Sequence, residues 1–183
     1  MQLWTQIAHE IPNSKIYLKA LAFNDPSTCE MYRQLFKAFG LPEDRLILEG
    51  AMPDKQHIPY FYAQVDIALD PFPYQGGVTT VESLWMGVPV LVLASEEYRS
   101  RTIGASIYNS LDLNHFLAHS EAEYLQKAKE WSIDRAFLRG CRKTLRTQLK
   151  NSLLCNGENF AFEVENAFTA LLSAKGKSLN DVV

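Results

Sequence analysis

The chain has 183 residues, of which 47% are hydrophobic and 21% are charged, and its formal net charge is −3. This length suits a single domain, and the slight acidity gives no support to nucleic-acid binding. Three cysteines, Cys29, Cys141 and Cys155, lie far apart without metal-ligand spacing, and no apolar stretch approaches the roughly 18 residues of a membrane span. We therefore expect a cytoplasmic protein that binds no metal, no membrane and no nucleic acid.

Helical and extended segments alternate through the first half of the chain. The helices predicted from apolar spacing and capping residues are Gln2–Glu10, Pro26–Phe39, His57–Gln64 and Val78–Met86. The strands predicted from short apolar runs are Lys15–Ala20, Arg45–Leu48, Val65–Leu69 and Val88–Leu93. Strands separated by helices of this length indicate parallel pairing with right-handed crossovers, which predicts a Rossmann-like, doubly wound α/β core over residues 1–95.

The second half is predicted to be mainly helical over residues 96–174, with a frayed tail over 175–183. The predicted helices are Ser100–Tyr108, Ser120–Trp131, Asp134–Lys150 and Glu158–Ala174, and Phe116–Ala118 is a candidate edge strand. The basic residues between Arg135 and Lys150 recur at helical spacing, which predicts the solvent-exposed face of an amphipathic helix. In the last helix Phe160, Phe162, Val164 and Phe168 are expected to be apolar anchors.

The stretch from Asp66 to Leu93 is the most informative part of the sequence. Ile67–Leu69 fits a buried parallel strand, and two prolines and the pair Gly76-Gly77 then interrupt regular structure. The helix expected from Val78 begins directly after these glycines. A helix start of this kind offers unpaired backbone N–H groups and the positive end of the helix dipole, the arrangement that binds phosphate oxygens.

Polar side chains follow the glycines at helical spacing. Thr79 and Thr80 lie in the first turn of the expected helix, and the Glu82 carboxylate could accept hydrogen bonds from both hydroxyls of a ribose. A Gly-Gly pair can also simply permit a turn, and Glu82 is compatible with a solvated helix face. Taken together, the glycines, hydroxyls and carboxylate favour a nucleotide-diphosphate site beyond the carboxyl end of a strand.

The same residues resemble a known family. Leu69–Thr80, followed by Glu82–Pro89, resembles the O-linked N-acetylglucosamine transferase family, which includes bacterial tetratricopeptide-linked members and SPINDLY-like O-fucosyltransferases. The resemblance continues into Ser100–Ser106 and begins upstream at Leu41–Leu48, so it covers most of the chain. It implies that residues 1–183 form the C-terminal, nucleotide-sugar-binding lobe of a two-lobed glycosyltransferase of the GT-B type.

The resemblance also implies roles for individual residues. The positions that carry over to the diphosphate are Gly76, Gly77, Val78, Thr79 and Thr80. Those that carry over to the ribose are Glu82 and Lys55, those that carry over to the base are Met52, Pro53 and His57, and Tyr74 falls near the donor sugar. Read without the resemblance, His57 would be a residue of an amphipathic helix, Lys55 a solvated lysine and Tyr74 an ordinary loop aromatic.

The sequence departs from the family pattern at two of these places. The family commonly has a lysine directly after the proline of the base-framing segment, whereas here Asp54 follows Pro53 and Lys55 comes one place later. Gly77 stands where the family has a histidine in the Gly-rich loop, as in many bacterial members.

The activity implied is transfer of a sugar from a nucleoside-diphosphate sugar to a Ser or Thr of a protein. Uridine diphosphate N-acetylglucosamine (UDP-GlcNAc) is the first choice of donor and guanosine diphosphate fucose (GDP-fucose) the second, and no metal is expected because the sequence has no Asp-x-Asp motif. Two alternatives stay open, a sugar-nucleotide epimerase-like domain and a degenerate, non-catalytic module that binds nucleotide or a partner.

The beginning of the chain carries a further expectation. A complete lobe of the family opens with a strand and a lysine-bearing loop, whereas this sequence opens with a predicted helix. The resemblance therefore implies an incomplete part of an enzyme, inactive alone, in which the first strand, the acceptor-binding lobe and the repeats are missing. No catalytic residue is assigned, and self-association through an exposed sheet edge is expected.

Overall fold

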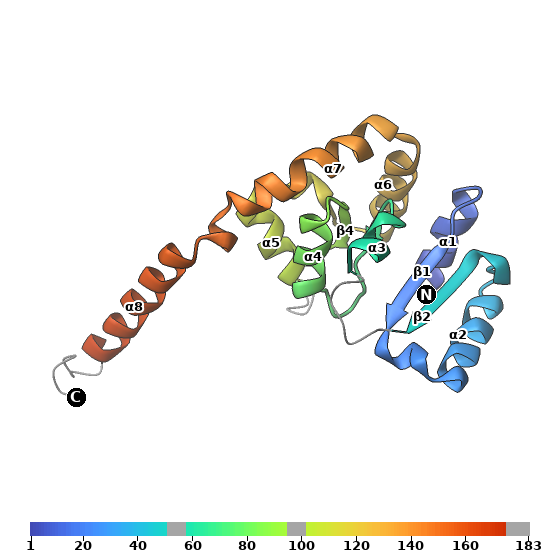
Figure 1. Cartoon of the computed structure of the whole chain (residues 1–183), viewed down its shortest axis with the longest axis horizontal. Coiled ribbons are helices and arrows are strands. Elements are labelled where there is room, and N and C mark those ends of the chain that lie inside the picture. The colour runs from blue at the N-terminus through green and yellow to red at the C-terminus, as the bar shows by residue number, and fades with distance from the viewer. Residues whose placement is uncertain (51–57, 95–101, 175–183) are drawn as a thin grey trace.

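The computed structural model describes residues 1–50, 58–94 and 102–174, in which helices surround short strands (Figure 1). The helices, in chain order, are α1 (Gln2–Glu10), α2 (Pro26–Ala38), α3 (Ile58–Ala63), α4 (Val78–Trp85), α5 (Ile103–Leu111), α6 (Glu121–Ile133), α7 (Arg135–Lys150) and α8 (Gly157–Ala174). Each overlaps a helix predicted from apolar periodicity, so those predictions are confirmed apart from a few terminal residues.

The strands form two parallel sheets. One sheet pairs β1 (Ile16–Ala20) with β2 (Leu46–Gly50), and in the other β4 (Val90–Leu93) lies between β3 (Ala68–Leu69) and β5 (Leu117–Ala118). Every pairing is parallel, which confirms the α/β class and the short edge strand before α6. Hydrogen bonding divides the strands of the described residues between two sheets.

The third strand is shorter than the sequence predicts. Pairing of β3 with β4 begins at Ala68, whose N–H donates to the Pro89 carbonyl over 2.9 Å. The strand was expected from Val65, but the Val65 carbonyl accepts a hydrogen bond from the Arg142 side chain of α7 instead of a ladder bond. Because a side chain satisfies this carbonyl, the segment before Ala68 needs no partner strand.

The main hydrophobic core surrounds β4, whose four residues are all buried. Leu3 and Ile7 of α1, Tyr124 of α6 and Leu145 of α7 pack into the same cluster. A smaller cluster joins α1 and α2 to the sheet of β1 and β2. Burial on both faces explains why the β4 sequence is continuously apolar, as parallel strands of α/β folds are.

The basic face of α7 is exposed to solvent and also contacts neighbouring helices. Arg142 and Arg146 are exposed, as predicted, but both also donate to backbone carbonyls of other helices. Arg142 binds the Tyr62 carbonyl of α3 over 2.9 Å, and Arg146 binds the Trp85 carbonyl of α4 over 2.7 Å. These guanidinium groups satisfy carbonyls that a helix end leaves without intrahelical partners, so α7 holds the ends of α3 and α4 in place.

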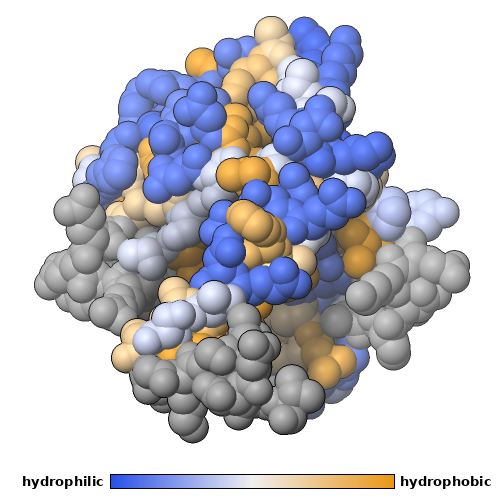
Figure 2. All heavy atoms as spheres, turned by 90° about the vertical axis from the view of Figure 1, so that its left-hand side faces the viewer, coloured by the Kyte–Doolittle hydropathy of each residue, from blue (hydrophilic) through white to orange (hydrophobic). Residues whose placement is uncertain are grey.

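The last helix is placed differently from the prediction. Figure 1 shows α8 projecting from the rest of the described chain, and Figure 2, viewed from that side, shows hydrophobic residues exposed among hydrophilic ones. No residue of α8 is buried, and Phe160, Phe162 and Phe168 are 70%, 60% and 61% exposed. The prediction that they act as anchors is wrong within the described residues, because α8 leaves the body at the short turn Leu153–Cys155.

The close approach of α7 to the end of α4 predicts a large effect of one glycine. Gly87 has a φ of +76°, and a Cβ there would lie 2.8 Å from the Arg142 Cα atom. We expect Gly87→Ala to lower the free energy of unfolding by about 2 kcal/mol or more, because the left-handed backbone and the clash with backbone both oppose a side chain. Urea unfolding followed by circular dichroism measures this change.

Gly140 provides the matched control, because it lies within α7 and a Cβ there meets nothing within 4 Å. Gly140→Ala should raise the free energy of unfolding by about 0.5–1 kcal/mol through helix propensity. Equal effects of the two substitutions would contradict the packing of α7 against the end of α4.

Candidate functional site

The predicted site lies at the carboxyl end of β3, where a loop of seven residues leads from Asp70 to the start of α4. The Asp70 side chain is 3% exposed, and its Oδ1 atom accepts a hydrogen bond from the Gly76 N–H over 2.8 Å. This bond closes the loop on itself and sets the direction in which α4 begins. The loop therefore occupies the edge at which doubly wound sheets bind ligands.

Burial changes the acidity of Asp70. Loss of solvent raises the pKa of its carboxyl from 3.8 to about 7, against the opposing effects of the Gly76 N–H and the Thr80 hydroxyl. The Thr80 hydroxyl lies close enough to lower this pKa but falls short of hydrogen-bond geometry, since neither Thr80 Oγ1 nor Asp70 Oδ2 has a partner among the described residues. Asp70 is thus a buried acid that titrates near neutral pH.

Gly76 is required at the closest point of the loop. A Cβ there would lie 2.7 Å from Thr79 Oγ1, 2.8 Å from Thr80 Oγ1 and 3.0 Å from Asp70 Oδ1. The two hydroxyls thus lie at the loop, as the sequence predicts, although Thr80 is buried and Thr79 is exposed. A Cβ at Gly77 would meet only Ile103 Cγ2, at 3.8 Å, so steric crowding does not require a glycine there.

Gln75 anchors the loop from inside. Its Nε2 atom donates to the Leu93 carbonyl at the end of β4 over 2.9 Å, and its Oε1 atom accepts from the Gly104 N–H of α5 over 2.7 Å. The side chain is 8% exposed. These two bonds join three segments that are distant in the sequence, so Gln75 ties the loop to the core.

The start of α4 has the features of an anion-binding site. Gly77 is its N-cap and has no side chain to cap the helix, and the N–H groups of Val78, Thr79 and Thr80 have no acceptor among the described residues. The Tyr62 hydroxyl of α3 donates to the Thr79 carbonyl over 3.2 Å and so fixes the first turn. Free N–H groups at a held helix start can bind phosphate oxygens.

Glu82 lies one turn further along α4. It is half-buried, and its charge adds to burial in raising the pKa of Tyr62 to about 12. Glu82 also lines a cavity of about 610 Å³ whose other walls are mostly apolar and include Gly77, Val81 and Trp85. A carboxylate at the rim of an apolar cavity next to free N–H groups suits a ligand with a flat ring, hydroxyls and phosphates.

The other residues predicted for the site are Tyr74 and the base-framing segment. Tyr74 is in the loop and 77% exposed. Met52, Pro53, Lys55 and His57 lie outside the described residues.

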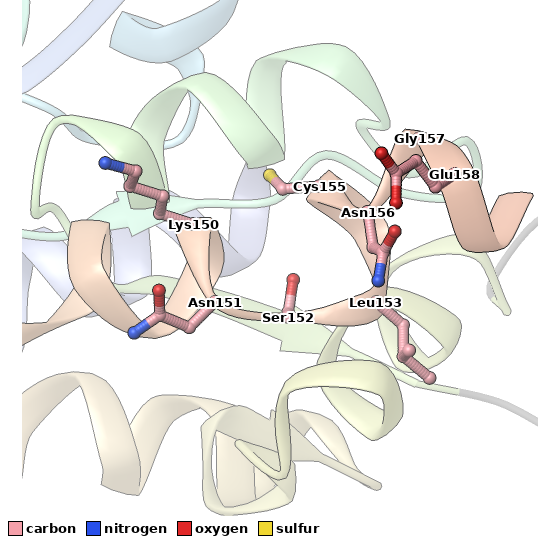
Figure 3. A pocket seen from close by; sticks show the side chains of 8 residues that line it. All are labelled: Lys150, Asn151, Ser152, Leu153, Cys155, Asn156, Gly157 and Glu158. Carbon is pink, nitrogen blue, oxygen red and sulfur yellow. The ribbon is translucent and has the colours of Figure 1, made fainter.

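A second hollow of about 390 Å³ lies at the joint of α7 and α8, where Figure 3 shows Lys150 and Asn151 on the α7 side and Glu158 on the α8 side.

Sequence reasoning placed Asp70–Gly77 at the end of the strand where ligands bind but gave Asp70 and Gln75 no role of their own. Asp70 gave a usable signal, because an acid that directly follows an apolar strand and precedes a glycine turn sits where ligands bind in α/β sheets. Gln75 gave none, since a glutamine beside two glycines is ordinarily a solvated loop residue.

The described residues show neither a metal-binding cluster nor a helix that could span a membrane. Over 1–50, 58–94 and 102–174, no three His, Cys, Asp or Glu side chains gather in a way that could hold a metal ion. Within the same ranges no helix has the length and apolar character needed to cross a membrane.

The parallel α/β core, the glycine turn, the uncapped helix start and the acid one turn later are features common in α/β domains that bind nucleotides. Comparison with known proteins gives the family. Residues 1–164 match Glycosyl transferase family 41, and the chain belongs to this family.

Relatives and a solved structure agree with this assignment. The chain is 33% identical over 172 residues to an Arabidopsis thaliana protein described as probable UDP-N-acetylglucosamine–peptide N-acetylglucosaminyltransferase SPINDLY, covering 92% of this chain and 18% of that protein. It is 30% identical over 145 residues to the probable transferase SEC of the same plant, covering 78% of this chain and 14% of SEC. A Thermobaculum terrenum O-GlcNAc transferase mutant superposes with a TM-score of 0.84 at 29% identity, over 91% of this chain and 32% of that one.

Crowding at Gly76 predicts unequal effects of alanine at the two loop glycines. We expect Gly76→Ala to lower the free energy of unfolding by about 1–3 kcal/mol, because the new methyl group displaces buried or hydrogen-bonded oxygens. Gly77→Ala should change it by about 0.5 kcal/mol or less. Thermal and urea unfolding of both variants test this, and equal losses would contradict the loop geometry.

The raised pKa of Asp70 predicts a pH-dependent cost to stability. As pH rises from about 4 to 7, the unfolded chain ionises Asp70 while the folded chain keeps the proton, so the carboxyl lowers stability across this window and by a constant amount above it. Asp70→Asn removes this effect. Relative to the unsubstituted protein, the variant should gain about 2 kcal/mol between pH 5 and pH 8 in urea unfolding.

Asp66→Asn is the control for this experiment, because Asp66 lies just before β3 with an exposed side chain. Its stability should follow the pH dependence of the unsubstituted protein. A gap between Asp70→Asn and the unsubstituted protein that stays constant from pH 5 to pH 8 would show that Asp70 titrates normally.

Proposed function

We propose that this chain is the donor-binding lobe of a protein O-glycosyltransferase that moves N-acetylglucosamine from UDP-GlcNAc to a Ser or Thr of a protein. The free N–H groups at the start of α4, beside Glu82 and its cavity, are the single observation that carries this proposal. Membership of glycosyl transferase family 41 and the names of the relatives support the choice of reaction. Because the chain spans 18% of the SPINDLY relative, the activity of a whole enzyme is part of the proposal.

In this proposal each part of the site meets one part of the donor. The groups proposed to hold the diphosphate are those of Gly76, Gly77, Val78, Thr79 and Thr80. Glu82 binds the ribose with Lys55, the segment containing Met52, Pro53 and His57 frames the base, and Tyr74 lies near the sugar. The burial of the Thr80 hydroxyl favours its backbone N–H over its side chain as the phosphate contact.

The chemistry needs stabilisation of a leaving nucleoside diphosphate. As the bond between sugar and phosphate breaks, negative charge develops on the diphosphate, and donors that are already oriented stabilise it without reorganising. Because α4 begins at a loop held by Asp70 and Gln75, its N–H groups are oriented before the ligand arrives. We propose that this chain uses these donors rather than a metal ion.

Several finer points belong to the same proposal. GDP-fucose is the second candidate donor, because the resemblance extends to SPINDLY-like O-fucosyltransferases. The acceptor is a Ser or Thr side chain of a protein, and the proposed compartment is the cytoplasm. Self-association through an exposed sheet edge is also proposed, and a sedimentation measurement that gives a monomer at all concentrations would contradict it.

The proposal is tested by calorimetric titration of the full chain with uridine diphosphate and guanosine diphosphate. We expect saturable binding of uridine diphosphate, and we expect Glu82→Gln to weaken it by about tenfold or more through loss of charge-assisted hydrogen bonds to the ribose. Glu165→Gln, on the exposed α8, is the matched control and should bind as the unsubstituted protein does.

The outcomes separate the alternatives. Preference for guanosine diphosphate would assign the second donor. Binding that Glu82→Gln leaves unchanged would contradict the ribose role of Glu82. Failure of both nucleotides to bind would refute the donor-lobe proposal and favour the degenerate module.

A further inference from the structure

The Asp70 carboxyl lies under the loop that is proposed to hold the diphosphate. One of its oxygens accepts the Gly76 N–H, while the other, Oδ2, is buried without a hydrogen-bond partner among the described residues. Thr80 Oγ1 is buried and unpartnered in the same way, and a Cβ at Gly76 would lie within 3.0 Å of both Asp70 Oδ1 and Thr80 Oγ1. The Thr80 hydroxyl can both donate and accept a hydrogen bond, so it can face this carboxyl in either protonation state.

No positive charge compensates Asp70 within the described residues, where no Lys, Arg or His forms an ion pair with it. The ionisable side chains that sense its charge are Tyr108 of α5 and Tyr124 of α6. Burial raises the pKa of both phenols far above neutrality, so both stay uncharged. The Tyr124 hydroxyl also lies 3.5 Å from the Asp70 carbonyl. Among the described residues, an ionised Asp70 would therefore be a buried charge with no opposite charge beside it.

A diphosphate bound to the same loop would add negative charge beside this carboxyl. Two like charges separated by one loop in a poorly solvated site repel each other, and protonation of the carboxyl removes the repulsion. The proton also makes the carboxyl a hydrogen-bond donor, and the Thr80 hydroxyl, which lies at the same loop, is able to accept it. The Gly76 N–H keeps its acceptor on Oδ1 in either state.

We propose that Asp70 is a positioning residue of the diphosphate loop and that it carries a proton whenever a nucleoside diphosphate is bound. The inference rests on the proposed function, which it deepens by assigning the protonation state in which the loop accepts its ligand. Asp70 touches the loop and not the reacting atoms, so it acts through Gly76 and Thr80.

This assignment makes binding depend on pH. Burial, opposed by the Gly76 N–H and the Thr80 hydroxyl, brings the pKa of Asp70 to about 7 in the free protein. Bound diphosphate raises this pKa further, so binding takes up a proton above neutrality. The protonated fraction of free protein falls to about one in thirty at pH 8.5, and the apparent affinity falls with it. Below pH 6 the carboxyl is mostly protonated and the affinity no longer depends on it.

The test is calorimetric titration with uridine diphosphate from pH 6 to pH 8.5, using the unsubstituted protein and Asp70→Asn. The amide is neutral throughout, accepts the Gly76 N–H and donates to Thr80, so it mimics the protonated acid. We expect similar affinities at pH 6, and at pH 8.5 a loss of up to about thirtyfold in the unsubstituted protein that Asp70→Asn does not share. Asp66→Asn, with its exposed side chain, should keep the pH dependence of the unsubstituted protein.

A second measurement keeps the proposal testable if Asp70→Asn does not fold. Titration of the unsubstituted protein at pH 8 in buffers of different ionisation enthalpy counts the protons taken up on binding. Uptake of most of one proton is expected, and uptake of none overturns the inference. Parallel pH profiles of the unsubstituted protein and Asp70→Asn also overturn it but leave the proposed function standing, whereas absence of binding at every pH refutes the proposed function itself.

Discussion

One hydrogen bond, from the Gly76 N–H to the Asp70 carboxyl, sets the shape of the candidate site. It turns the chain back at the end of β3, so that the first N–H groups of α4 open toward the edge at which α/β sheets bind ligands. Glycine suits this position because a Cβ at Gly76 would crowd the oxygens of Thr79 and Thr80. A buried acid and a glycine six residues later thus form one structural unit.

Hydrogen bonds from elements on two sides fix the position of the loop and of α4. Gln75 binds both the end of β4 and the start of α5, and Tyr108 of α5 donates to the Val90 carbonyl over 2.5 Å. On the other side, Arg142 and Arg146 of α7 bind carbonyls near the ends of α3 and α4. The helix start is therefore tied to the surrounding elements on both sides, as the proposed role of its N–H groups in stabilising developing charge requires.

The helices could be predicted because local sequence carries their signals. Asp25 caps α2, Ser120 caps α6 and Asp134 caps α7, each accepting backbone N–H groups of the first turn. The apolar stripe of α7 is buried as its spacing predicts. The same kind of pattern gave a wrong prediction of burial for α8. Periodicity shows that a helix has an apolar face and says nothing about whether another surface covers that face.

The sequence by itself determined the order of helices and parallel strands, the glycine turn before α4 and the position of Glu82 one turn into that helix. These depend on residues close together in the chain. Only the tertiary structure decided that Asp70 is a buried acid, that Gln75 is a buried anchor and that Thr80 turns its hydroxyl inward. The reason is that burial and hydrogen-bond partners come from distant segments, since Gln75 meets Leu93 and Gly104 only after the sheet has formed.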